Sequence, residues 1–219
     1  MKYKIITLLI ILVSIFYINE VNASLNGFPL IGKIIYLDAG HGGRDPGAQY
    51  QNTNEKDINL SIVKKLKHTL ESYGATVYLT RETDTDLSQG VKNNKKRTDL
   101  QARADLINNS KSDIYISIHQ NSYAFTKWRG LQVFYDKIND KNKELAQTIT
   151  DALKSDLSNV RDIKNVNDYY MYSKIKIPGI LIETGFITND EDRALLKQDS
   201  YQNKLALSIA KGIINYFNN

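Results

Sequence analysis

Residues 34–47 read IIYLDAGHGGRDPG, an apolar run that leads directly into a glycine-rich loop. The run at residues 34–37 holds two isoleucines, a tyrosine and a leucine, a composition typical of a buried strand. The loop places His41 among four glycines and Pro46. In α/β proteins a short buried strand often delivers a reactive side chain to the carboxyl edge of the sheet in this way. From this stretch alone, a functional site and a flexible turn with an incidental histidine are equally good interpretations.

Outward from this stretch, segments of strand type and helix type alternate along the chain. Strands are expected at residues 33–38, 75–80, 113–119, 130–135, 169–172 and 179–182, and helices at 55–73, 97–109, 144–157, 191–196 and 202–217. The first helix carries apolar residues three and four apart and ends before Gly74. The alternation predicts a three-layer α/β domain with a mostly parallel sheet. Residues 81–96 lack an apolar period and are expected to form a long exposed loop.

Composition bounds the class of protein. The chain of 219 residues is 42% hydrophobic and 24% charged, which fits one globular domain with a substantial core. It has no cysteine, so disulfides and thiolate metal sites are excluded. The net charge of +5 is compatible with an acidic polymer or a membrane surface as a partner, without singling out either. The basic cluster at residues 92–97 is read as solvated surface, with contact to an anionic polymer as the alternative.

The first 23 residues have the pattern of an export signal. Lys2 and Lys4 precede an apolar segment at residues 5–18, which is shorter than the ~20 residues that span a bilayer. Small residues before position 24 offer a cleavage site after Ala23. We therefore expect residues 1–23 to be a signal peptide or an N-terminal membrane anchor, and residues 24–219 to form one domain outside the cytoplasmic membrane. Export argues against nucleic acid as a partner.

Four polar side chains are expected at one edge of the sheet. His41 follows the first strand, His119 ends the strand at 113–119, and Glu183 follows the strand at 179–182. Glu55 opens the helix that comes after the first strand. Because the carboxyl ends of parallel strands meet at one edge, where that helix also begins, we expect the four to converge. Each residue also has a purely structural interpretation. His41 and His119 could be hydrogen-bonded loop histidines, Glu183 a loop acid, and Glu55 an acid favoured by the start of a helix.

Two imidazoles and a carboxylate form a ligand set for Zn²⁺ that leaves a fourth position for water, as in catalytic sites. Zinc lowers the pKa of such a water and polarises a carbonyl group. A second carboxylate can pass the proton of the water to a leaving amine, so the set is suited to hydrolysing an amide. Two rivals are weaker: His68 and Glu71 have the H-x-x-E spacing of some zinc carboxypeptidases, but His68 is expected to face solvent. Ser122 lacks the G-x-S-x-G turn of a serine nucleophile.

At these residues the chain resembles a known family. The segments LDAGHGGRDPGA (37–48), SIHQNS (117–122) and PGILIETGFITN (178–189), with Glu55 between the first two, resemble in order the blocks of the zinc-dependent N-acetylmuramoyl-L-alanine amidases of bacterial cell walls, the Amidase_3 family. The likeness extends over residues 33–217. Gln120 and Ser122 stand where the family often has small residues, and Thr184 stands where family members vary, which leaves only the detail of substrate fit open.

The resemblance implies a fold and a chemistry. The family fold is a mixed sheet of about six strands flanked by helices. The zinc ligands carry over to His41, Glu55 and His119, with one Zn²⁺ per chain, and the catalytic carboxylate carries over to Glu183. The substrate is peptidoglycan, and the bond cleaved is the amide between N-acetylmuramic acid and L-alanine.

Neighbouring residues receive supporting roles. Gly42 and Gly43 are expected to permit a close approach of the substrate to the backbone. Asn121 is expected either to bind the substrate or to fix its own loop. Asp38 is expected to orient His41 without binding the metal itself. Arg103 is expected to pair with a buried acid.

A bare catalytic domain behind an export signal is similar to the germination-specific (CwlD-type) amidases of spore formers. We therefore expect a role in spore cortex maturation or germination, in the cell wall or at the outer face of the cytoplasmic membrane, with the forespore intermembrane space included. The alternatives are a vegetative cell-wall amidase (autolysin), a zinc enzyme for another amide, and a non-catalytic peptidoglycan-binding protein. The last is disfavoured because all four chemical positions are filled. Expected partners are peptidoglycan, an activating or recruiting protein and, through the N-terminus, a membrane surface.

Overall fold

Six strands form a mixed sheet in the order β4-β1-β5-β8-β6-β7. The computed structural model describes residues 7, 10–11, 13–14, 27–167 and 169–219. Neighbouring strands of this sheet are parallel except for β6 and β8, which confirms the expected mixed, mostly parallel sheet. Its strands are β1 (Ile34–Ala39), β4 (Thr76–Leu79), β5 (Ile114–Asn121), β6 (Gln132–Tyr135), β7 (Lys164–Asn165) and β8 (Gly179–Phe186), and a separate hairpin joins β2 (Gln49–Tyr50) to β3 (Thr53–Asn54).

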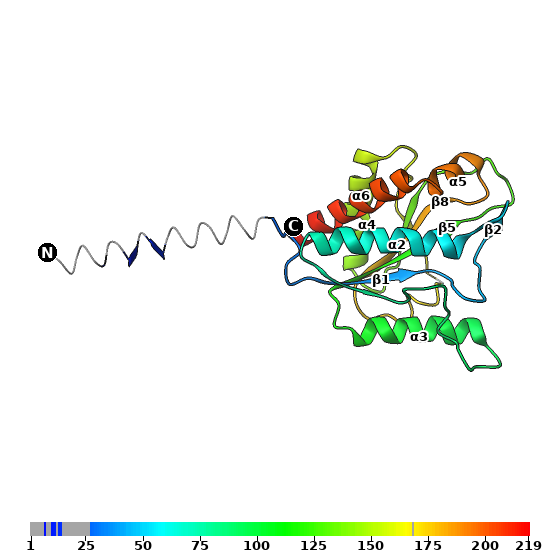
Figure 1. The fold of residues 1–219 in the computed structure, drawn as a ribbon, viewed down its shortest axis with the longest axis horizontal. Coiled ribbons are helices and arrows are strands. Elements are labelled where there is room, and N and C mark those ends of the chain that lie inside the picture. The colour runs from blue at the N-terminus through cyan, green and yellow to red at the C-terminus, as the bar shows by residue number, and fades with distance from the viewer. Residues whose placement is uncertain (1–6, 8–9, 12, 15–26, 168) are drawn as a thin grey trace.

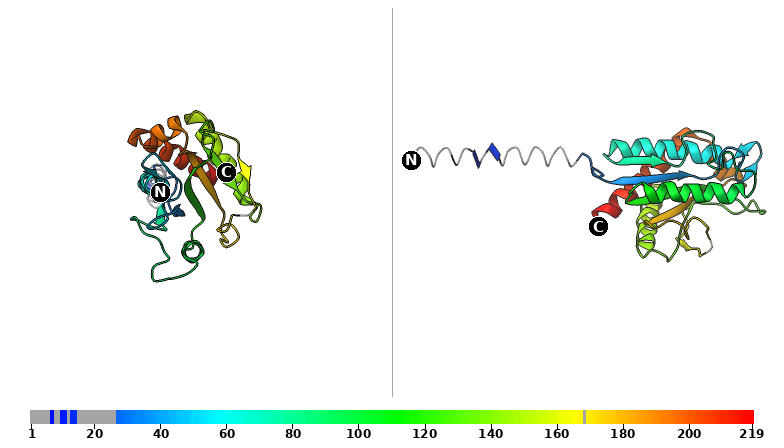
Figure 2. Two further views of the ribbon diagram at one scale, coloured as in Figure 1. Left: turned by 90° about the vertical axis from the view of Figure 1, so that its right-hand side faces the viewer. Right: turned by 90° about the horizontal axis from the view of Figure 1, so that it is seen from below.

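Helices cover both faces of the sheet, which gives the three layers expected from the sequence (Figures 1 and 2). Among the described residues, the helices are α2 (Glu55–Ser72), α3 (Lys95–Asn109), α4 (Lys141–Asp156), α5 (Asp190–Leu196) and α6 (Asp199–Asn218). Helices α2, α4 and α6 share one hydrophobic core with the sheet. Helix α3 and the segment at residues 169–177 form a second, smaller core on the other face.

Strand β5 shows how the sequence builds this sandwich. Successive side chains of a strand point to opposite faces of the sheet. The isoleucines at 114, 116 and 118 therefore enter the larger core, while Tyr115 enters the smaller one. His119 continues along the face of Tyr115, at the end of the strand where the core gives way to solvent.

The predicted strand at residues 169–172 is wrong. These residues form turns, and the outer strand of the sheet is the short β7 at Lys164–Asn165. Met171 and Tyr172 are buried in the core beneath α3. Their apolar character therefore reflects packing against a helix, which a strand pattern does not distinguish. The other predicted strands and helices are confirmed within a few residues of their expected ends.

The loop after β4 is less exposed than expected. Arg81 and Ser88 are buried, although their neighbours are mostly exposed. The Arg81 guanidinium donates hydrogen bonds to the carbonyl oxygens of Ala39, Gly40 and Lys56 at 3.0, 3.1 and 2.7 Å. The loop is thus fastened against the glycine-rich segment that follows β1, a contact that local sequence periodicity does not reveal.

The predicted signal or anchor at residues 1–23, and the cleavage after Ala23, lie outside the described residues apart from residues 7, 10–11 and 13–14. Within the described part of the chain, every helix is too short or too polar to cross a membrane.

Candidate metal centre and active site

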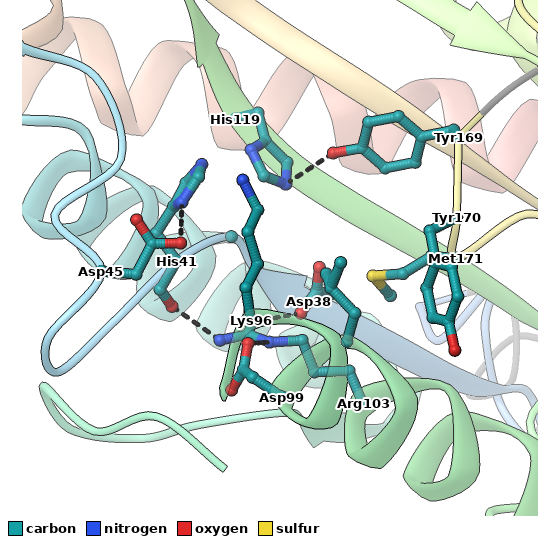
Figure 3. A pocket seen from close by; sticks show the side chains of 12 residues that line it. Asp38, His41, Asp45, Lys96, Asp99, Arg103, His119, Tyr169, Tyr170 and Met171 are labelled. Carbon is teal, nitrogen blue, oxygen red and sulfur yellow. Dashed lines mark hydrogen bonds and ion pairs between the residues drawn. The ribbon is translucent and has the colours of Figure 1, made fainter. Parts of the chain in front are cut away.

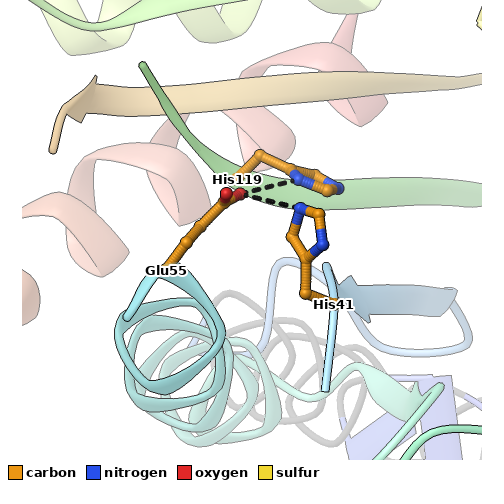
Figure 4. A group of neighbouring side chains, drawn as sticks. All are labelled: His41, Glu55 and His119. Atoms are coloured by element: carbon orange, nitrogen blue, oxygen red, sulfur yellow. Dashed lines mark hydrogen bonds and ion pairs between the residues drawn. The ribbon is translucent and has the colours of Figure 1, made fainter. Parts of the chain in front are cut away.

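His41, Glu55 and His119 meet at the carboxyl edge of the sheet (Figure 4). His41 lies in the loop after β1, His119 lies near the end of β5, and Glu55 is the first residue of α2. The Oε1 atom of Glu55 is 3.2 Å from Nε2 of His41 and 2.9 Å from Nδ1 of His119. The convergence expected from the order of strands and helices is therefore present.

These three donor atoms fit a metal ion. All three lie within 4.8 Å of one another, and ligands held about 2.1 Å from a tetrahedral ion are roughly 3.4 Å apart. Burial alone would raise the pKa of Glu55, but hydrogen bonds and charge from His119 and His41 lower it well below its usual value. The carboxylate is therefore ionised at neutral pH. Two nitrogens and one anionic oxygen suit a divalent cation such as Zn²⁺.

Asp45 orients His41. Its Oδ2 atom is 2.8 Å from Nδ1 of His41, which leaves Nε2 of the ring facing Glu55. Metal-binding histidines commonly place their outer nitrogen against a carboxylate in this way. The expectation that Asp38 fills this role is wrong. The available signal was the position of Asp45 in the same loop, four residues after the histidine.

Asp38 belongs instead to a buried network beneath the site. Arg103 contacts Asp38 and Asp99, each at 2.7 Å, so the predicted pairing of Arg103 with a buried acid is confirmed. The same guanidinium donates to the carbonyl oxygens of Ala39 and His41 at 2.8 and 2.7 Å. Burial alone would raise the pKa of Asp38, but Arg103 and hydrogen bonds lower it to about 2. The ion pair thus anchors the backbone that carries His41.

A tyrosine hydroxyl lies beside the outer nitrogen of the second histidine. The Oη atom of Tyr169 is 3.4 Å from Nε2 of His119, and the two rings meet edge to face (Figure 3). Burial and the negative charge of Glu183 raise the pKa of Tyr169 well above its usual value, so the hydroxyl is neutral. Sequence reasoning missed this residue because its segment was interpreted as a strand.

Glu183 is the neighbour of His119 on the adjacent parallel strand, in the same register. It lies inside β8, which continues to Phe186, so the expectation that it follows the strand is corrected. Its Oε2 atom is buried and has no hydrogen-bond partner among the described residues. Burial raises the pKa of Glu183 to about 8, with a further contribution from the charge of Glu55 and an opposing one from His41. A carboxyl group in this setting can hold and release a proton near neutral pH.

Two glycines make room for the proposed ligands. A Cβ atom at Gly40 would lie 2.2 Å from Cε1 of His119. A Cβ atom at Gly47 would lie 2.6 Å from Oε2 of Glu55. Any larger residue at either position would displace a ligand side chain. These two positions therefore have a direct role in the site that sequence reasoning did not assign.

Glycine is needed at positions 42 and 43 for a different structural reason. A Cβ atom at Gly42 would lie 2.4 Å from the carbonyl oxygen of Thr85, and one at Gly43 would lie 2.8 Å from the backbone nitrogen of Asp86. Both glycines also have positive φ angles, +135° and +57°. Packing against the loop after β4 thus accounts for both glycines. Their expected contact with substrate stays a prediction.

Polar side chains brace the end of β5. Gln120 donates to Oδ1 of Asn59 at 2.8 Å and to Oγ1 of Thr184 at 3.0 Å. It thereby joins α2, β5 and β8 just behind His119, which gives Gln120 and Thr184 a shared structural role. The Oδ1 atom of Asn121 accepts a hydrogen bond from the backbone N–H of Ser122 at 2.9 Å. Asn121 thus contributes to its own loop, and its substrate contact stays a prediction.

A pocket opens beside the two histidines on the side of α3 (Figure 3). Lys96 lines this pocket and a neighbouring one that includes Arg44, and it forms no ion pair among the described residues. The pocket therefore offers the histidines, the hydroxyl of Tyr169 and an unpaired cation to a bound molecule. His68, by contrast, is exposed on α2 and remote from this group, as expected.

Comparison with known proteins agrees with this geometry. The family model described as N-acetylmuramoyl-L-alanine amidase (Amidase_3) matches residues 35–215. The germination-specific N-acetylmuramoyl-L-alanine amidase of Bacillus subtilis (strain 168) is 44% identical over 193 residues, which are 86% of this chain and 81% of the relative. The N-acetylmuramoyl-L-alanine amidase LytC of the same organism is 33% identical over 86% of this chain and 36% of its own length.

A solved structure shares the fold. The CwlD amidase from Clostridioides difficile, determined in complex with the GerS lipoprotein, superimposes with a TM-score of 0.82 at 40% identity. The match covers 85% of this chain and 99% of that chain. With the family model matching nearly the whole described domain, the chain belongs to the Amidase_3 family of N-acetylmuramoyl-L-alanine amidases.

Proposed function

We propose that this amidase cleaves the amide between the lactyl group of N-acetylmuramic acid and L-alanine in peptidoglycan, with one Zn²⁺ held by His41, Glu55 and His119. The observation that carries this proposal is the placement of three donor atoms within 4.8 Å of one another, next to a strand whose Glu183 lies in register with His119. Membership of the family supports the same reaction.

Glu183 is the proposed general base and general acid. A Zn²⁺ ion at the three ligands would polarise the substrate carbonyl, acidify a water molecule and favour the ionised form of Glu183. The Glu183 carboxylate would accept a proton from a water molecule as the oxygen of that water attacks the carbonyl carbon. Glu183 then donates the proton to the alanine nitrogen, and the carbon–nitrogen bond breaks. The products are a lactyl carboxylate and a peptide with a free N-terminal alanine.

The residues around the ligands hold them in place for this reaction. Asp45 keeps Nε2 of His41 pointed at the metal position. Arg103 anchors the backbone of the same residue through its carbonyl oxygen. Because a shift of about 1 Å at a reacting group can cost about a hundredfold in rate, such supports are part of the catalytic equipment.

We assign the enzyme to the spore cortex, as an exported protein of cortex maturation or germination. The relative that supports this is named germination-specific, and the match covers 81% of its length. A vegetative cell-wall role is the second candidate, supported by the 33% identity to LytC. The CwlD amidase was solved with a lipoprotein bound, which supports a protein partner for this chain as well. Residues 1–23 are assigned to export, as a signal peptide or a membrane anchor.

The decisive experiment uses residues 24–219, stripped of metal and reloaded with Zn²⁺. Purified cortex and vegetative peptidoglycan are digested separately, and the products are identified by mass spectrometry. Zinc-dependent release of peptides with a free N-terminal alanine is the expected result, with faster release from cortex. Release of acetate would identify a deacetylase and overturn the proposed reaction. Equal rates on both walls would overturn only the assignment to the cortex.

A further inference from the structure

Three aromatic side chains project into solvent from the loop that follows β5. Tyr123, Phe125 and Trp128, which we call the aromatic platform, are 51%, 63% and 43% exposed. The ring of Tyr123 lies 5.8 Å from that of Phe125 and 6.3 Å from that of Trp128, measured between centroids. The three rings thus form one contiguous surface. Exposed apolar clusters of this kind usually mark a binding surface.

The loop that carries the platform is fastened to the domain. The side-chain amide of Asn189 donates to the carbonyl oxygen of Thr126 at 2.6 Å, and the backbone N–H of Tyr123 donates to Thr188 at 3.3 Å. At the far end of the loop, the N–H of Gly130 donates to the buried carboxylate of Asp192 at 2.7 Å. These bonds fix the backbone of the loop from which the three rings project.

Positive charge accompanies the rings. The Nζ atom of Lys127 is 5.9 Å and the guanidinium of Arg161 is 5.4 Å from the ring of Trp128. Neither cation pairs with a carboxylate among residues 27–167 and 169–219. Arg129 lies in the same loop but is paired with Glu191. The platform therefore offers flat apolar surface and two available cations together.

The platform lies on the catalytic edge of the sheet. Its loop leaves β5 just after His119 and leads to β6, and β8 lies between these two strands. Arg161 also lies 5.8 Å from the ring of Phe186, at the end of the strand that carries Glu183. The described chain enters β1 from the opposite end of the sheet (Figure 1). A polymer bound with one amide at the metal centre would therefore extend over this surface.

We infer that the aromatic platform binds the glycan strand of peptidoglycan on the flank of the active site, an inference that rests on the proposed function. The C–H faces of pyranose rings are apolar and pack on aromatic rings, while the hydroxyl groups at the edges of the sugar stay in water. Lys127 and Arg161 would meet carboxylates of the stem peptides. A protein partner is the competing occupant, because interfaces are enriched in aromatic residues and arginine. The glycan is favoured by the position of the platform beside the metal centre, where the substrate polymer must pass. A membrane fits less well, because it would cover the edge where the polymer must enter.

The test separates polymer binding from catalysis. Binding of the intact protein to insoluble peptidoglycan is measured by co-sedimentation in a Glu183→Gln background, which prevents digestion. Tyr123→Ala with Trp128→Ala is compared with Phe28→Ala, an aromatic residue that is 46% exposed and lies near Gly74, beyond the far end of α2. We expect the double variant, which loses two rings, to bind at least about tenfold more weakly, on the scale known for nucleobases that stack on aromatic side chains. Phe28→Ala should bind like its parent.

Two further measurements distinguish a loss of polymer binding from a loss of catalysis and from a folding defect. With Glu183 restored, the double variant should lose activity on polymeric peptidoglycan while its kcat/KM on a soluble muramoyl-peptide stays within twofold of wild type. Unchanged thermal unfolding and zinc content exclude a folding defect. Unaltered binding to the polymer would overturn the inference. The inference would also be overturned if the double variant lost binding to phosphatidylglycerol vesicles but not to peptidoglycan, because that result would identify a membrane contact. Failure of wild type to cleave the soluble fragment would instead contradict the proposed function.

Discussion

Glu183 and His119 are direct neighbours on adjacent parallel strands, in the same register. The distance between the proposed base and one proposed ligand is therefore set by backbone hydrogen bonds of the central sheet. Strands hold side chains more precisely than loops do, which is an advantage where small displacements change the rate. The remaining ligands come from a loop and from a helix start, and both are tied down by other contacts.

Replacement of Glu183 by Gln should remove catalysis and leave metal binding intact. The amide cannot accept the proton of water, and general acid–base groups contribute about 10²- to 10⁴-fold. We expect kcat to fall by that factor while zinc content stays at one ion per chain. Glu144→Gln, on the first turn of α4, serves as the control. Loss of zinc together with activity would mean that Glu183 is a ligand.

Replacement of Asp45 by Asn should weaken zinc binding. The Asp45 carboxylate contacts Nδ1 of His41 at 2.8 Å, and outer partners of this kind are worth about 10- to 100-fold in metal affinity. Competition with a chelating dye would measure the loss. Asp105→Asn, on the exposed side of α3, should bind zinc like wild type. Equal affinities of the two variants would refute the orienting role.

Replacement of Gly40 by Ala should disrupt the metal site through sterics alone. The added Cβ would fall within 2.6 Å of three atoms of the His119 ring. We expect zinc binding to be lost while circular dichroism still reports a folded domain. Gly90→Ala has open space around its Cβ but a φ of +79°, so it should cost some stability and keep zinc. A Gly40→Ala protein that retains full zinc affinity would show that the His119 ring can move aside.

Replacement of Arg103 by Leu should destabilise the fold. It leaves the fully buried carboxylate of Asp38 without its cation, and breaking a buried ion pair costs about 3–5 kcal/mol. Urea unfolding at pH 7 would measure the difference in free energy. Arg97→Leu, an exposed position on the same helix, should change the free energy of unfolding by less than about 1 kcal/mol. Similar values for both variants would contradict a structural role for the pair.

The same ion pair predicts a dependence of stability on pH. The pKa of Asp38 is lowered from 3.8 to about 2 in the folded protein, so the ionised folded form is favoured by about 2 kcal/mol. Because the folded pKa is depressed, this contribution is complete above about pH 4 and is lost as the pH falls towards 2. The difference in unfolding free energy between wild type and Asp38→Asn should therefore shrink over that range. A difference independent of pH would contradict this account.

The sequence by itself determined the order of elements and the identity of the converging groups. Alternating strand and helix patterns are local, because they depend on side chains two to four residues apart. The carboxyl ends of parallel strands share one edge of a sheet, which predicts that His41, His119 and Glu183 lie together. Glu55 is predicted to join them because it begins the adjacent helix. Both steps use information carried by short stretches of chain, and both agree with the structure except for the strand expected at residues 169–172.

Only the tertiary structure decided which groups support the site. Asp38 and Asp45 both lie near His41 in sequence, but the side chain of Asp38 points towards Arg103 on a distant helix. The need for glycine at position 40 comes from the His119 ring on another strand. The apolar residues at 169–172 pack beneath a helix instead of forming a strand. Each outcome depends on contacts between segments far apart in the chain, which local patterns do not contain.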